Sequence, residues 1–128
     1  MFNYDWKKQV VLGLFLSITS SFVFAQSGNY PNRPIKIIIP FPPGNTTDIM
    51  TRMIQPKLQE ALGQTVVVEN KAGASGTIGM DFVAKSKPDG YTIAASQGGN
   101  MVVLPHTSKT ISYNPIKDFA PIALSTTN

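Results

Sequence analysis

The candidate chemistry of this chain lies in three segments that combine glycines with hydroxyl and amide side chains, residues 41–48, 70–77 and 97–100. Glycine lets a backbone N–H approach a ligand closely, and the side chains add further hydrogen-bond donors. Donors of this kind suit a carboxylate. Lys71 is the one cation in these segments, so a polyanion such as a nucleoside triphosphate would be poorly compensated. From the residues alone an alternative stays open, in which the glycines only permit tight turns and the hydroxyls only cap helices.

A catalytic interpretation of the second segment centres on Ser75. The run Gly-Ala-Ser-Gly-Thr at residues 73–77 lies between an expected strand and an expected helix, as a nucleophile elbow does. Its second glycine, however, comes one position too early for that motif. The only histidine, His106, would have to complete a triad, and it follows Pro105 in a segment that we expect to be a solvated loop. A small serine hydrolase using Ser75 is therefore the weaker alternative, and we predict that the chain is not an enzyme.

The spacing of the other polar residues supports no nucleotide, metal or cofactor. Gly73, Gly76 and Gly79 match neither the dinucleotide fingerprint nor the phosphate-binding loop. The acidic residues lack metal-ligand spacing and the chain has no cysteine. Asp48, at the expected start of a helix, is interpreted as a cap rather than as an acid catalyst. The chain has a net charge of +4, but its basic residues are scattered, so no nucleic-acid partner is predicted.

Apolar, largely β-branched runs alternate with helical patterns, which predicts an α/β fold with a parallel βαβαβ core. We expect strands over residues 35–40, 65–69 and 91–96, and helices over residues 49–62 and between residues 77 and 87. Right-handed crossovers then give the strand order 2-1-3. Because parallel strands point the same way, the three segments that follow them should converge on one edge of the sheet.

Local signals refine these elements. The first helix is expected to kink at Pro56 and to end at Gly63. Its candidate caps are Thr46, Thr47 and Asp48. Apolar residues of the second helix share one face, namely Ile78, Phe82 and Val83. Beyond the third strand we expect a short helix at residues 101–104 stopped by Pro105, an exposed excursion at residues 107–114, and the start of a fourth strand at residues 122–126.

The amino terminus has the pattern of a secretory signal peptide. Lys7 and Lys8 precede an apolar run at residues 10–24, and Ala25 provides a small residue for cleavage before Gln26. The run is shorter than the roughly 20 apolar residues of a spanning helix. We therefore expect residues 1–25 to be removed on export and residues 26–128 to form the mature, soluble part.

Three longer segments are informative as whole sequences. They read YPNRPIKIIIPFPPGNTTDIMTR, LGQTVVVENKAGASGTIGMDFVAKSKPDGYTI and SYNPIKDFAPIAL. Together they resemble the Bug family, the periplasmic substrate-binding receptors of tripartite tricarboxylate transporters. The resemblance implies a two-lobed, hinged receptor of the periplasmic-binding-protein (type II) fold. Such a receptor captures a small carboxylate and presents it to membrane permease subunits, without a cofactor.

In that family the loops after the first two strands bind the ligand carboxylate. The resemblance transfers this role to Phe41, Gly44, Asn45, Thr46, Thr47 and Asp48, to Ala74, Ser75 and Gly76, and by position to Ser96, Gly98 and Asn100. Two of these positions depart from the family pattern. Asn45 stands where the family usually has a second glycine, and Ser75 where it often has glycine. Because Asn tolerates a left-handed conformation, we expect the first turn to survive.

Length separates the chain from this family, whose members are usually more than twice as long. We expect residues 26–128 to be the N-terminal part of the first lobe, truncated before the crossover to the second. A single lobe leaves half of a ligand in water, so we expect binding only at about millimolar concentration. The alternative is a truncated remnant that binds nothing.

Overall fold

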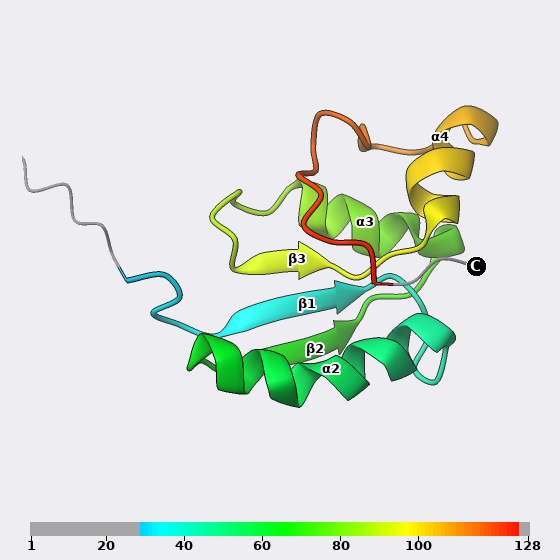
Figure 1. Ribbon diagram of the computed structural model, residues 1–128. Coiled ribbons are helices and arrows are strands. Elements are labelled where there is room, and N and C mark those ends of the chain that lie inside the picture. The colour runs from blue at the N-terminus through cyan, green and yellow to red at the C-terminus, as the bar shows by residue number, and fades with distance from the viewer. Residues whose placement is uncertain (1–28, 126–128) are drawn as a thin grey trace, which may run out of the picture.

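Strand β1 (Ile35–Ile39) forms the centre of a three-stranded parallel sheet in the computed structural model, which describes residues 29–125 (Figure 1). Strands β2 (Val66–Asn70) and β3 (Thr92–Ala94) lie on its two sides, in the order β2-β1-β3. In register, Ile37 lies between Val68 and Ile93. The sequence prediction of a parallel βαβαβ core with the order 2-1-3 is confirmed. The expected signal peptide lies outside the described residues.

Helices α2 (Thr46–Leu62) and α3 (Thr77–Ala84) provide the two crossovers and lie on opposite sides of the sheet (Figure 1). A 3₁₀ turn, η1 (Ala74–Gly76), precedes α3, and a π-helical turn, η2 (Gly99–Val103), leads into α4 (Leu104–Thr107). This arrangement encloses β1, whose isoleucines are buried: Ile35, Ile37, Ile38 and Ile39. No helix of residues 29–125 is long and apolar enough to cross a membrane.

Helix α2 begins earlier than its apolar pattern predicted. Its N-cap is Asn45, whose extended backbone (φ −68°, ψ 156°) lets the side-chain oxygen accept a hydrogen bond from the Thr47 N–H. The three caps proposed from the sequence are wrong, because they lie inside the first turn: Thr46, Thr47 and Asp48. The helix continues through Pro56 and ends at Gly63 in the left-handed conformation (φ 61°), as predicted.

The side of α2 that faces β2 is polar. The Gln55 amide donates to the Val66 carbonyl oxygen at 2.6 Å, and the Gln59 side-chain oxygen accepts from the Val66 N–H at 3.0 Å. Apolar side chains of the same helix remain exposed instead, among them Ile49 and Met53. The outward-facing backbone groups of an edge strand need partners, and the two glutamines supply them.

Helix α3 also turns an unexpected side toward the sheet. Met80 and Gly79 are buried, whereas Ile78 and Phe82 are exposed. A Cβ at Gly79 would lie 2.8 Å from the Cα of Pro40, so this glycine permits close packing of the helix on the end of β1. Of the three apolar residues that the sequence assigned to one face of this helix, Ile78 and Phe82 are thus exposed and Val83 is half-buried.

The last third of the described chain departs most from expectation. The helical segment starts at Gly99 and continues through Pro105, the second residue of α4. His106 is exposed, but on α4 rather than in a loop. Tyr113 is buried inside the predicted excursion. Residues 122–125 are exposed and form no strand, so the predicted fourth strand is wrong over its described part.

Candidate functional site

The three glycine-containing segments meet at the carboxyl edge of the sheet, as predicted. Side-chain hydrogen bonds join them directly. The Gln97 amide of the third segment donates to the Thr47 hydroxyl of the first at 2.8 Å. The Asn100 amide, also of the third segment, donates to the Ser75 carbonyl oxygen of the second at 2.8 Å. Residues separated by 25 and 50 positions in the chain thus belong to one site.

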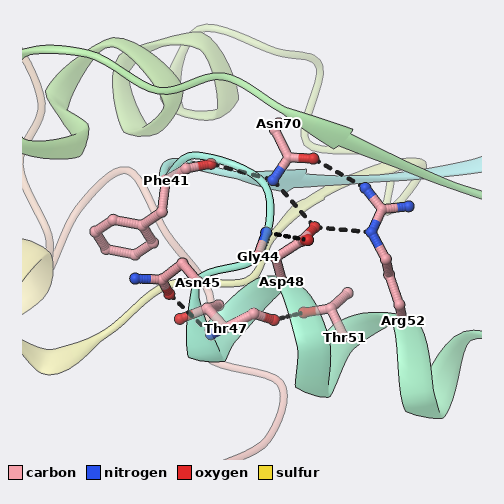
Figure 2. A network of polar contacts seen from close by, with 8 residues as sticks. All are labelled: Phe41, Gly44, Asn45, Thr47, Asp48, Thr51, Arg52 and Asn70. Atoms are coloured by element: carbon pink, nitrogen blue, oxygen red, sulfur yellow. Dashed lines mark hydrogen bonds and ion pairs between the residues drawn. The ribbon is translucent and has the colours of Figure 1, made fainter.

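Asp48 organises the first loop from beneath (Figure 2). It is only 4% exposed, and its carboxylate accepts hydrogen bonds from the Gly44 N–H and the Arg52 Nε at 2.8 Å each. The Asn70 amide donates to it as well, at 3.1 Å. The Gly44 hydrogen bond lowers the pKa of Asp48, and Asn70 and Arg52 lower it further, against the opposing effect of burial. Asp48 is an ionised group that positions the loop, and its oxygens are occupied by protein donors.

Asn70 is a member of this network that the sequence did not single out. Its amide nitrogen also donates to the Phe41 carbonyl oxygen at 3.1 Å, and its side-chain oxygen accepts from the Arg52 guanidinium at 2.9 Å. It therefore ties the end of β2 to the loop after β1 (Figure 2). The available signal was its place as the last residue of a strand at the edge where the loops converge.

The orientation of the Asn45 side chain follows from its partners. The Thr47 backbone N–H can only donate, so the Asn45 atom that faces it at 2.9 Å must be the oxygen. Gln97, a second residue that the sequence did not single out, donates to the same oxygen at 3.4 Å. The Asn45 NH₂ group therefore points away from the helix and makes no hydrogen bond within residues 29–125 (Figure 2). The left-handed conformation considered for Asn45 is not used, because its backbone is extended.

The second loop carries the left-handed backbone instead. Ala74 (φ 46°) and Ser75 (φ 56°) are both left-handed, and Gly76 follows at φ 91°. The Ala74 carbonyl oxygen accepts hydrogen bonds from the Thr77 N–H and hydroxyl, so it is directed toward α3. Because the C=O and N–H of one trans peptide point in opposite directions, the Ser75 N–H is directed away from α3. Successive N–H groups in such a turn form a concavity that favours anions.

Some backbone donors at this edge are unoccupied by protein groups. The N–H of Thr46, in the first turn of α2, and the N–H of Ser75 make no hydrogen bond within residues 29–125. Both residues are exposed. The helix N-terminus and the turn each provide a partial positive charge, so each attracts an anion without a cationic side chain.

The remaining predicted residues differ in what they present to solvent. Gly44, Ala74 and Gly98 are exposed, and Phe41, Thr47 and Ser96 are partly buried. Gly76 is buried, and a Cβ there would lie 2.5 Å from the Asn100 amide nitrogen. Asn100 is 2% exposed, and its side-chain oxygen accepts from the Ser96 hydroxyl at 3.3 Å. The site thus combines exposed donors with the buried amide side chain of Asn100.

The charged groups of the described chain offer no alternative site. Lys71 is paired with Glu69 at 2.7 Å and lies 4.5 Å from the centre of the Phe82 ring. Within residues 29–125 no three acidic or histidine side chains gather as metal ligands do. A shallow hollow exists beside Gly63, but it lies at the opposite edge of the sheet and contains none of the predicted site residues.

Comparisons with known proteins identify a matching family and similar structures. A family described as the tripartite tricarboxylate transporter family receptor matches residues 50–128. BugT of Bordetella pertussis is 41% identical over 115 residues, which cover 89% of this chain and 35% of BugT. The structure of MatC from Rhodopseudomonas palustris with bound malate is 35% identical, with a TM-score of 0.71 over 74% of this chain and 32% of MatC. An R. palustris protein solved with adipate is 36% identical, with a TM-score of 0.61 over 69% of this chain and 29% of that protein.

The chain spans about a third of the length of the curated relatives it matches. The solved structures confirm the predicted fold, an α/β lobe of a periplasmic binding protein. The matched family consists of receptors, which confirms the prediction that the chain is not an enzyme. The family match covers more than half of the sequence, and the chain belongs to the tripartite tricarboxylate transporter receptor family.

Proposed function

We propose that this chain contributes the carboxylate-binding loops of a periplasmic solute receptor. The observation that carries the proposal is the pair of unoccupied N–H donors, Thr46 and Ser75, at the edge where all three loops meet. Asn45 adds an oriented amide donor beside them. A carboxylate has four lone-pair sites and accepts several such bonds, each contributing about 1.5–3 kcal/mol.

Electrostatics at the first loop support an anionic ligand. The Asp48 carboxylate lies under this loop and would repel an anion, but Arg52 and the Gly44 N–H neutralise it at 2.8 Å. The unpaired partial charges at the rim are then the positive ends of α2 and of the turn at residues 74–76. Related proteins were solved with malate and with adipate, so small carboxylates of this size are the first ligands to test.

The proposed cellular role is the one expected of a receptor of this family. The receptor acts in the periplasm after export through the signal peptide at residues 1–25. It presents its ligand to the membrane permease subunits of a tripartite transporter. In this proposal residues 26–128 belong to the first lobe, and the contacts that select one carboxylate over another arise from both lobes of the complete receptor.

A proline substitution tests the site with little disturbance of the fold. Thr46 is the first residue of α2, where proline is favoured, and Asn45 before it has the extended backbone that proline requires. Thr46→Pro therefore removes one N–H donor and leaves the helix in place. Thr46→Ala is the matched control, because it removes the side chain and keeps the N–H.

The binding of malate and adipate is followed by amide NMR shifts, which also report millimolar affinities. We expect saturable shifts at Ser75 and its neighbours. The affinity obtained from them should be about tenfold weaker in Thr46→Pro and unchanged in Thr46→Ala. Succinamide, which is neutral, should produce none. Equal shifts with succinamide, or equal affinities in wild type and Thr46→Pro, would show that these N–H groups do not bind carboxylate.

A further inference from the structure

Tyr113 is connected to the second loop through two successive hydrogen bonds. It is 5% exposed, and its hydroxyl donates to the Asn100 carbonyl oxygen at 2.7 Å. Its ring packs edge to face on Phe119, with the ring centres 5.7 Å apart. The Asn100 side chain in turn donates to the Ser75 carbonyl oxygen at 2.8 Å. A residue far along the chain thus reaches the loop that the proposed function assigns to the ligand.

The direction of the Asn100 amide is determined by its surroundings. The Ser75 carbonyl oxygen can only accept, so the Asn100 atom facing it must be the nitrogen. The side-chain oxygen then faces the Ser96 hydroxyl, which donates to it at 3.3 Å. Every buried side-chain nitrogen and oxygen in residues 29–125 has a partner, so a change in one member leaves another unpaired.

The second loop needs a stabilising contact from outside the loop, because its own backbone is strained. Two consecutive non-glycine residues, Ala74 and Ser75, are left-handed. The other hydrogen bonds of this turn are local, between Gly73 and Gly76 and between Ala74 and Thr77. Within the described chain, Asn100 supplies the hydrogen bond that ties the turn to a distant segment.

We infer that Tyr113 is a positioning residue that holds the ligand loop at residues 74–76 through Asn100. This inference rests on the proposed function for its effect on binding, but the geometry of the loop can be measured separately. Within residues 29–125 the Tyr113 hydroxyl makes no hydrogen bond to the loop itself. It fixes the backbone of η2, and η2 sets the place of the Asn100 amide against which the Ser75 carbonyl is held.

Removal of one hydroxyl tests the inference. Tyr113→Phe keeps the ring and its contact with Phe119, and it deletes only the hydrogen bond to Asn100. Tyr91→Phe is the matched control, since the Tyr91 hydroxyl also makes hydrogen bonds, to Asn32, at the opposite end of the sheet. We expect Tyr113→Phe to shift the Ser75 and Gly76 amide resonances and to weaken malate binding about tenfold, and Tyr91→Phe to do neither.

A double substitution separates positioning from a general loss of stability. If Tyr113 acts through Asn100, then Asn100→Ala should move the same resonances, and adding Tyr113→Phe to it should weaken binding by less than the product of the two effects. If the double variant loses affinity by the full product of the two single effects, the inference is overturned. It is also overturned if the Ser75 resonances stay in place in Tyr113→Phe. If wild type binds no carboxylate, the proposed function fails, and the resonance shifts still decide whether Tyr113 holds the loop.

Discussion

The left-handed backbone at Ser75 predicts that replacing this residue by glycine stabilises the protein. Ser75 has φ 56° and ψ 29°, a conformation that glycine adopts without steric conflict. Its side chain is exposed and makes no hydrogen bond within residues 29–125, so Ser75→Gly sacrifices no contact there. The same chain contains a natural comparison, because Gly63 has nearly the same backbone angles, φ 61° and ψ 19°.

The expected magnitude follows from two opposing terms. A left-handed non-glycine residue costs about 1–2 kcal/mol, and glycine loses about 0.5–1 kcal/mol more backbone entropy on folding. The net gain for Ser75→Gly is therefore about 0.5–1 kcal/mol. In a domain of about 100 residues this corresponds to a rise in Tm of roughly 2–8 °C. The reciprocal change Gly63→Ser should lower Tm by a similar amount, since a Cβ there meets no atom within 4 Å.

Thermal unfolding followed by circular dichroism measures both variants in one experiment. Opposite shifts of similar size would assign the cost to backbone conformation, because the two positions share that conformation and differ in sequence. A Tm for Ser75→Gly at or below that of wild type would refute the reasoning, provided that Gly63→Ser is destabilised. In that case the loop at residues 74–76 would not hold Ser75 in the left-handed region.

Three further predictions concern caps, close packing and pH. Asn45→Ala should lower the free energy of unfolding by about 1 kcal/mol and Asn45→Ser by only a few tenths, measured by urea denaturation; equal losses would contradict the capping role. Gly76→Ala should cost about 2–5 kcal/mol of stability, because Gly76 has a positive φ and an added Cβ would lie 2.5 Å from the buried Asn100 amide. Gly98→Ala should change stability by no more than about 0.5 kcal/mol, because a Cβ there meets open space. Denaturation midpoints in the reverse order would refute this. The pKa of Asp48 is lowered in the fold, so its contribution to stability is present above its ordinary pKa of 3.8 and is lost as the pH falls below 3.8. Burial raises the pKa of Tyr113 above 10.0, so stability declines as the pH rises past 10.0. Urea midpoints that stay constant at both extremes of pH would contradict these shifts.

Much of the fold was predictable because β1 is a nearly uninterrupted run of isoleucine, a pattern that requires cover on both faces. Which face of each helix meets the sheet was not predictable, because apolar periodicity identifies a helix without showing what it packs against. In α2 the sheet-facing positions include Gln55 and Gln59, whose value lies in backbone hydrogen bonds to Val66. In α3 the residue that permits close contact with the sheet is Gly79, because it has no side chain.

The candidate site was predictable as a place, because parallel strands bring their carboxyl ends to one edge. The role of each residue there was not. Asp48 and Asn100 are buried within the protein network, and Asn70 and Gln97 join loops through amide contacts that depend on the tertiary structure. Sequence position shows that polar side chains gather, but only geometry shows which of their atoms remain unbonded.

The pair of glutamines on α2 also bears on how the chain avoids unwanted association. Within residues 29–125 strand β2 lies at the edge of the sheet, and an exposed edge is a template for the addition of a strand from another molecule. Gln55 and Gln59 occupy the outward N–H and C=O of Val66, the groups through which an incoming strand would begin to pair. The helix therefore closes the start of this edge with its own side chains, and growth of the sheet into intermolecular aggregates is opposed at that point by the monomer itself.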